Sequence, residues 1–318
     1  LNHRFFYHQG KASTIMAQGW TFKGNLSVRE RFVVKKRTAW IIVHLGFILA
    51  LLSGCAINPA TGEEEMMFFS PEKDVALGRK YAPEIEKALG GRIPDENLQN
   101  YVNRIGQRIA RVCHRPDLSY SYVAVDDKMT NALALPGGYV YITRGLLAEL
   151  KTEAQLAAVL AHETGHVVAR DTMAAISRQI GMAAVVAAVQ VGADSRSAGV
   201  GAGFVAATLS LQYSREDEHD ADITGLSYMT QAGYDPNGMV ETMKILEELQ
   251  TIRPVEFFST HPNPESRIAY LEEKIARRYA DMTGLKTGRE EYAKDVLEPL
   301  SRTRDRVNTQ IGESWGTK

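Results

Sequence analysis

Two histidines four positions apart, His162 and His166, stand in the segment AHETGHVVAR, with Glu163 directly after the first of them. In an α-helix, positions i and i+4 lie on one face, so both imidazoles can point at one metal ion. Glu163 lies about 100° further round the helix, where it reaches a water molecule beside that ion. Metal-assisted hydrolysis needs this division: two neutral nitrogens hold zinc, and a carboxylate takes a proton from water. The alternative is a helix whose histidines hydrogen-bond in the core.

A catalytic zinc site has three protein ligands and an open fourth position, so one more ligand must come from another element. The chain has only two cysteines, and any metal must therefore sit on histidine and carboxylate. The segment 214–225, SREDEHDADITG, places Glu218 and Asp222 four positions apart on a second expected helix. One of them can bind the metal while the other accepts the free N–H of a metal-bound histidine. His219 points about 100° away from Glu218 and is expected to be a surface or core histidine.

Four motifs together resemble metallopeptidase family 48. They are H-E-x-x-H at 162–166, E-x-x-x-D at 218–222, NALALPGGYVYITRGLL at 131–147 and STHPNPESR at 259–267. The resemblance covers about 70–275. This family of gluzincin zinc peptidases includes the CAAX prenyl endopeptidase, the heat-shock membrane protease and bacterial lipoprotein or periplasmic quality-control proteases. The first two carry several membrane helices, and some periplasmic members carry a repeat domain. This sequence has neither feature, so the substrates of those members are not carried over.

The resemblance implies one Zn²⁺ per chain, bound by His162, His166 and Glu218. It makes Glu163 the catalytic base and Asp222 a partner of a ligand. His261 lies in a proline-held loop that in the family is close to the metal. It is expected to stabilise the oxyanion, to plug the open metal position, or only to order its loop. Gluzincins lay an extended peptide along an edge strand, and the matching residues here are Asn131, Ala132, Leu133, Ala134 and Leu135.

The N-terminal part of the chain has the pattern of a targeting segment. A basic stretch at 29–37 precedes an apolar run at 39–52, which is shorter than the roughly 18 residues of a spanning helix. The run ends in LSGC, which resembles the lipobox of bacterial lipoproteins, so Cys55 is expected to carry a lipid. Ala56 rather than Asp after that cysteine indicates the outer membrane, facing the periplasm. Cys113 is then a single free thiol, expected to be buried and inert.

The rest of the chain predicts an α+β fold that is mostly helical, with a small antiparallel sheet beside the active-site helix. Helices are expected from Ser70-Pro71, over 96–113, over 153–178 and over 215–231. A strand over 120–127 and a hairpin turning at Pro136-Gly137-Gly138 make the sheet. The apolar stretch 180–211 indicates a pair of closely packed interior helices, with a membrane-touching hairpin as the alternative.

Four regions are expected along the chain. They are upstream sequence and signal peptide over 1–54, a lipidated cysteine and tether over 55–69, the peptidase domain over 70–275, and a loosely packed helical extension over 276–318. The formal net charge of −1 gives no field that would attract nucleic acid, so no such partner is expected.

The expected function is a zinc endopeptidase acting on misfolded or unassembled envelope proteins, which would be its partners. One alternative is a chaperone or assembly factor at the outer membrane that cuts little. A zinc hydrolase for a lipid is another, and it depends only on the apolar stretch 180–211.

Overall fold

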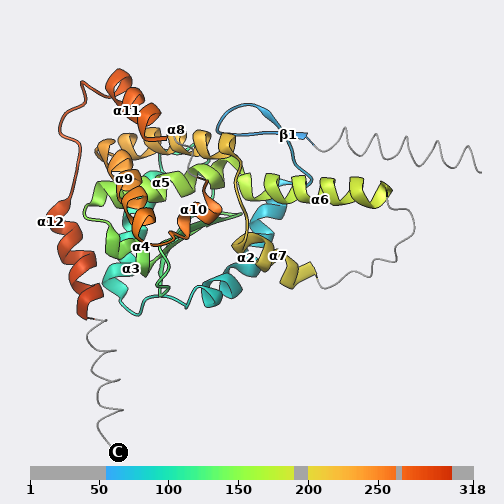
Figure 1. Ribbon diagram of the computed structural model, residues 1–318, viewed down its shortest axis with the longest axis horizontal. Helices are drawn as coiled ribbons and strands as arrows, with labels where there is room; N and C mark the ends of the chain where they lie inside the picture. The colour runs from blue at the N-terminus through green and yellow to red at the C-terminus, as the bar shows by residue number, and fades with distance from the viewer. Residues whose placement is uncertain (1–54, 190–199, 263–266, 303–318) are drawn as a thin grey trace, which may run out of the picture. The chain divides into compact units, whose positions relative to one another are not determined.

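The computed structural model describes residues 55–189, 200–262 and 267–302, and Figure 1 draws the remainder as a grey trace. The expected signal segment and the last residues of the C-terminal extension lie outside the described ranges. So does the middle of the 259–267 motif. The described residues are mostly helical with two small sheets, which confirms the predicted α+β class.

The strands come in two groups, one of two strands and one of three: β1 (Cys55–Ile57), β2 (Glu64–Met66), β3 (Ser121–Val125), β4 (Ala132–Leu135) and β5 (Tyr139–Thr143). The helices in the first half of the chain are α2 (Pro71–Ala88), α3 (Glu96–Ala110), α4 (Arg144–Glu149) and α5 (Glu153–Ala169). The helices that follow α5 are α6 (Asp171–Val189), α7 (Val200–Leu209), α8 (Arg215–Gln231), α9 (Asn237–Ile252), α10 (Phe257–Thr260), α11 (Arg267–Arg278) and α12 (Arg289–Tyr292). A π-helical turn over Ala293–Leu297 comes after α12.

The three-stranded sheet has the order β3–β5–β4, and the prediction of an all-antiparallel sheet was wrong. The hairpin β4–β5 is antiparallel, as predicted, and its turn places Gly137 and Gly138 at positive φ, where glycine is favoured. β3, however, runs parallel to β5. The segment between β3 and β4 carries the chain past the middle of the sheet, so the returning β5 fits between them. β4 therefore lies at one edge of this sheet, and β3 lies at the other.

Helix α5 carries the H-E-x-x-H motif and is the centre of the fold (Figure 1). The hydroxyl of Thr152 caps it by accepting the N–H of Gln155. The helix was predicted to continue to about residue 178, but it ends at Ala169. Arg170 adopts the left-handed conformation with φ 68°, and α6 starts afresh after it. The guanidinium of Arg170 is held by the carboxylate of buried Asp74, which fixes this break.

The main core surrounds α5, which packs against α3, α8, α9 and the sheet. Every residue of α5 is buried. Part of the expected loose extension also belongs to this core, which corrects that prediction for the described residues. Tyr292, Val296 and Leu300 are all buried in it, and the Tyr292 hydroxyl donates to the carbonyl of Leu147. An aromatic and two aliphatic side chains at helical spacing give this segment its buried face.

The expected tether is partly structured, because β1 and β2 pair as an antiparallel hairpin. The stretch 180–211 contains the end of α6 and all of α7, so it is helical as predicted, but some of its described residues are not interior. Ile180 is 47% exposed, and Gly203 is exposed as well. Among the described residues, no helix has the length and apolar character to cross a membrane.

Candidate metal centre

The centre lies where α5 and α8 cross at short range, and two glycines allow that approach. A Cβ at Gly225 on α8 would lie 2.9 Å from the backbone nitrogen of His162. A Cβ at Gly165 on α5 would lie 3.1 Å from the Cα of Ala221. Because neither position has a side chain, the two backbones come close enough for short carboxylates on α8 to reach imidazoles on α5.

Four buried side chains aim one donor atom each at a common point: His162, His166, Glu218 and His261. These atoms all lie within 4.8 Å of one another. The Nε2 atoms of His162 and His166 are 3.1 Å apart. Oε1 of Glu218 lies 3.4 Å from Nε2 of His166, and Nδ1 of His261 lies 3.3 Å from Nε2 of His162. The i, i+4 pair of α5 and Glu218 of α8 are thus brought together.

This donor set fits zinc. Zinc bound at about 2.0–2.1 Å in a tetrahedron places neighbouring donor atoms about 3.3 Å apart, which is close to the separations in the cluster. Two imidazoles with a carboxylate are a zinc ligand set found in hydrolases. The presence of three histidines and one carboxylate in a dry cluster also disfavours magnesium or calcium, which prefer oxygen ligands.

Each candidate imidazole ligand on α5 is held from behind by an acid. Nδ1 of His162 lies 3.0 Å from Oδ1 of Asp222, and Nδ1 of His166 lies 2.7 Å from Oδ2 of Asp171. An Nδ1–H that donates to a carboxylate leaves Nε2 free of hydrogen and pointing at the cluster. Asp171 was not singled out in the sequence. Its position could have identified it, because Asp171 lies five residues after His166 at the start of α6.

Arg267 balances the two acids of α8. Its Nη1 donates to Oε2 of Glu218 at 2.9 Å, and its Nε and Nη2 donate to the two oxygens of Asp222 at 2.8 and 2.7 Å. Arg267 is 1% exposed, so these ion pairs have almost no contact with water. The guanidinium beside Asp222 holds the pKa of that carboxyl far below its usual range, although burial alone would raise it. Tyr270 also donates its hydroxyl to Asp222.

Glu163 is buried, and neither of its carboxylate oxygens has a hydrogen-bond partner among the described residues. Nε2 of His261 is likewise buried without such a partner and lies 3.5 Å from Oε1 of Glu163. Burial raises the pKa of Glu163, which makes it a better proton acceptor. Buried polar atoms without partners call for an explanation such as a bound water or ion, and these three atoms face the metal cluster.

Two aromatic rings line the donor cluster. Tyr213 stacks on His166 with ring centroids 3.9 Å apart and an interplanar angle of 8°. Phe257 stacks on His261 at 4.3 Å and 11°. The Tyr213 hydroxyl bonds to Thr172, whose own hydroxyl donates to the carbonyl of Ala134 on the edge strand. Sequence spacing gave no sign of either ring, because both reach the site from distant loops.

The edge-strand residues Asn131 to Leu135 lie beside the centre, on the side of α5. The amide of Thr143 donates to the carbonyl of Asn131, which marks Asn131 as a residue that pairs with β5. By alternation, the main-chain groups of Ala132 and Ala134 face away from β5. The residues of β4 and the side chains of the donor cluster are all buried, however, so any cleft between them is closed in this conformation.

The loop that carries His261 closes the cleft next to the edge strand. The amide of Phe257 donates to the carbonyl of Thr130, directly before the edge strand, and Glu256 accepts the amide of Thr130. Further along, the amide of Tyr213 donates to the carbonyl of Thr260. The loop is thus pinned at both ends of α10, and these bonds hold His261 in the cluster.

The other predicted residues lie apart from the centre. His219 has an exposed side chain beside Asp220, as expected of a surface histidine. Cys113 is a buried free thiol, as predicted, and its sulfur faces the hydroxyl of Tyr120. His114 bonds instead to Tyr228, so the adjacent cysteine and histidine do not form a pair. Cys55 begins β1.

Comparison with known proteins gives consistent matches. The sequence profile of peptidase family M48 matches residues 96–275. The mitochondrial metalloendopeptidase OMA1 of Schizosaccharomyces pombe is 36% identical over 177 residues, which cover 54% of this chain and 52% of that protein. The putative beta-barrel assembly-enhancing protease of Vibrio cholerae is 30% identical over 200 residues, covering 59% of this chain and 41% of that protein. The beta-barrel assembly-enhancing protease of Escherichia coli is 27% identical over 222 residues, covering 66% and 45%.

The matched region spans about half the length of these relatives or less. The profile match, in contrast, covers more than half of the present chain and includes α5, α8, the edge strand and the His261 loop. It therefore contains every residue of the donor cluster. The chain belongs to peptidase family M48, a family of metallopeptidases.

Proposed function

We propose that this chain is a zinc-dependent endopeptidase, with His162, His166 and Glu218 as the zinc ligands and Glu163 as the general base. The observation that carries the proposal is the convergence of the donor atoms beside a buried carboxylate with no partner. A carboxylate kept dry and unbonded costs stability, and a role in proton transfer explains why it is there. Asp222 and Asp171 act as positioning residues, because they touch the ligands and not the substrate.

Zinc, when bound, lowers the pKa of a water molecule towards 7 and polarises the scissile carbonyl. The chain's own residues supply the rest. Oε1 or Oε2 of Glu163 accepts a proton from the attacking water and then delivers it to the leaving amine nitrogen. The carbonyl of Ala132 and the amide of Ala134 point outward from the edge strand, where they can pair with the main chain of an extended peptide. The buried aromatic walls exclude bulk water.

We further infer that His261 plugs the centre at rest. Its Nδ1 lies 2.8 Å from Oε1 of Glu218, at the position of a fourth donor, and its other nitrogen faces Glu163. A zinc site with four protein donors is closed, whereas a catalytic one keeps a position open. The imidazole thus stands between the ligands and the base, where water and substrate must enter. Of the roles expected for His261, this geometry favours the plug over an oxyanion donor.

Replacing His261 by Ala is expected to raise peptide cleavage at least about tenfold, because it removes the fourth donor and leaves the ligands and the base in place. The measurement is the rate of casein hydrolysis by the zinc-loaded full chain, together with its zinc content. His219→Ala is the matched control, since that histidine is exposed on α8, and it should leave the rate unchanged. A fall in rate with zinc retained would mean that His261 takes part in catalysis.

The substrates proposed are misfolded or unassembled envelope proteins. The names of the Vibrio and Escherichia relatives refer to beta-barrel assembly, which supports this class. We propose that Cys55 is lipidated after removal of 1–54 and that the protein faces the periplasm at the outer membrane. Because Cys55 is the first residue of the hairpin β1–β2, a lipid at Cys55 would hold the peptidase domain near the lipid surface.

A chaperone or assembly role with little proteolysis is the second candidate, and the closed cleft favours it as a resting state. If the wild-type chain and the His261→Ala variant both fail to cut casein yet suppress its aggregation, this second role replaces the first. Lipid hydrolysis lacks a comparable observation.

A further inference from the structure

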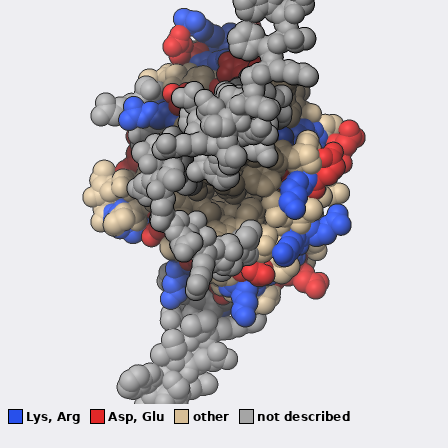
Figure 2. Space-filling view, turned by 90° about the vertical axis from the view of Figure 1, so that its right-hand side faces the viewer, with Lys and Arg blue, Asp and Glu red and all other residues tan. Residues whose placement is uncertain are grey.

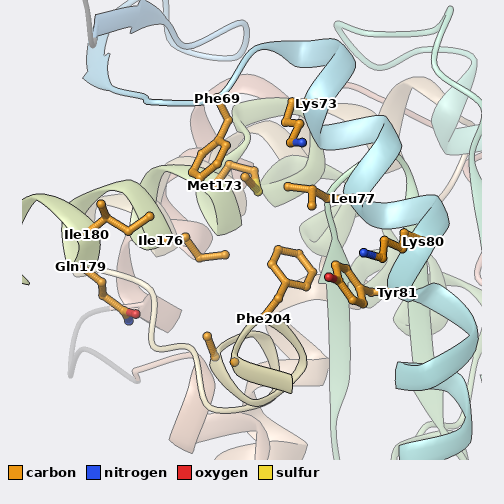
Figure 3. A pocket seen from close by; sticks show the side chains of 12 residues that line it. Phe69, Lys73, Leu77, Lys80, Tyr81, Met173, Ile176, Gln179, Ile180 and Phe204 are labelled. Carbon is orange, nitrogen blue, oxygen red and sulfur yellow. The ribbon is translucent and has the colours of Figure 1, made fainter. Parts of the chain in front are cut away.

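An apolar groove lies between α2, α6 and α7, and none of its lining residues belongs to the metal centre (Figure 3). Its volume is about 640 Å³. Leu77 and Tyr81 from α2, Met173 and Ile176 from α6, and Phe204 from α7 point into it. Pockets that hold small ligands measure about 300–1,000 Å³, so there is room for one acyl chain or a few side chains.

The charge on the rim of the groove has one sign. Lys73 and Lys80 are the charged residues that line it, both on α2 and both exposed, and no carboxylate is among the lining residues. The ammonium of Lys80 lies 4.9 Å from the centre of the Tyr81 ring. Figure 2 views the molecule from the side of α6 and α7, where both basic and acidic side chains border uncharged surface. An apolar floor under a basic rim is complementary to an acyl chain with an anionic headgroup.

Exposed apolar side chains also occur on the rim of the groove and on or directly after the hairpin β1–β2. Ile57 is 66% exposed, Met66 44%, Phe68 37% and Ile180, on the rim of the groove, 47%. The hairpin and the groove share one apolar cluster, in which Ala56 and Phe69 pack with Met173 and Phe204. The amide of Phe68 donates to Ser177 on α6, which fixes the hairpin beside that helix. On the hairpin, Ala56 lies on the face that packs on this cluster, whereas Ile57 and its partner Glu64 lie on the opposite face.

We propose that this face docks on an anionic phospholipid surface, with an acyl chain in the groove and phosphate groups at Lys73 and Lys80. The inference does not depend on the peptidase activity or on a lipid at Cys55. A hydrophobic peptide could fill the floor of the groove, but it would not account for the paired lysines. Anionic lipid accounts for both the apolar floor and the basic rim. Docking there leaves the metal centre free, because the two sites share no residue.

The test is photo-crosslinking from a single position in the full chain. The photoreactive residue p-benzoylphenylalanine replaces Ile180, or, in the control protein, Ile252, which is 74% exposed and lies on α9. Each protein is irradiated with vesicles of phosphatidylglycerol and phosphatidylcholine in the presence of unfolded casein. Adducts are then identified by mass spectrometry. Any contact made by residues 39–52 is the same in both proteins. A difference in adducts between the two proteins therefore reports on the local surface at positions 180 and 252. Phospholipid adducts are expected at 180 and only background at 252.

The two lysines provide the charge test. Each basic residue near an anionic surface contributes about fivefold to binding, so Lys73→Gln with Lys80→Gln should lower the adduct yield at 180 by up to about 25-fold. The matched pair Lys128→Gln with Lys151→Gln, two exposed lysines outside the groove, should leave the yield unchanged. Equal lipid yields at 180 and 252, or no drop with the groove lysines replaced, would overturn the proposal. So would adducts to casein in place of lipid at 180, since they would make the groove a peptide site.

Discussion

Glu163→Gln is expected to lower casein cleavage by about 10²- to 10⁴-fold while the chain keeps its zinc. The carboxylate oxygens make no hydrogen bond that the amide would break, so the substitution changes the chemistry and not the packing. Burial raises the pKa of Glu163, which suits it to take a proton from water, and an amide cannot do so. The comparison is best made with His261 also replaced by Ala, because an open centre gives the larger signal.

The matched control for this substitution is Glu216→Gln, an exposed acid in the first turn of α8. It should leave both rate and zinc content unchanged. If the zinc-loaded Glu163→Gln protein cleaves casein at the parent rate, Glu163 is not the general base. Loss of zinc together with activity would show that the residue holds the site together instead.

The second large effect is expected for Arg267→Ala, and it is a loss of stability. The substitution removes a guanidinium that neutralises Glu218 and Asp222 and leaves the two buried carboxylates with only histidine and tyrosine partners among the described residues. Breaking a buried ion pair from one side costs about 3–5 kcal/mol of the free energy of unfolding. We expect a loss of that size for the zinc-free protein in urea denaturation. Zinc should recover part of it, because the metal supplies positive charge beside Glu218.

Arg277→Ala is the control for the stability experiment. Arg277 pairs with Glu273 four residues earlier, but both side chains are exposed, so the change should stay below about 0.5 kcal/mol. A loss below about 1 kcal/mol for Arg267→Ala would mean that water or another cation already screens the two acids, contrary to their burial.

Local signals in the sequence predicted most of the helices. They also predicted which side chains lie together on one face of a helix. Ser70, Thr152 and Ser214 cap helices as their positions indicate. The i, i+4 spacing was enough to place His162 with His166 and Glu218 with Asp222. These features depend on neighbours a few residues away, and that is the range in which sequence spacing carries geometric information.

Features set by distant contacts were missed. The break at Arg170 depends on Asp74, nearly a hundred residues earlier, and nothing near position 170 marks a helix end. The parallel pairing of β3 with β5 follows from the path of the chain and not from strand composition. Arg267 reaches the centre from the start of α11 and Tyr213 from the loop before α8, so their roles became visible only with the fold. The burial of Tyr292 and Val296 depends in the same way on where the C-terminal segment returns.

The most direct test of the metal centre is anomalous diffraction at the zinc edge from crystals of the full chain grown with one equivalent of zinc. The proposed zinc site requires a single strong peak about 2.0–2.2 Å from Nε2 of His162, Nε2 of His166 and a carboxylate oxygen of Glu218. A peak elsewhere in the molecule, or no peak between these three side chains, would contradict it.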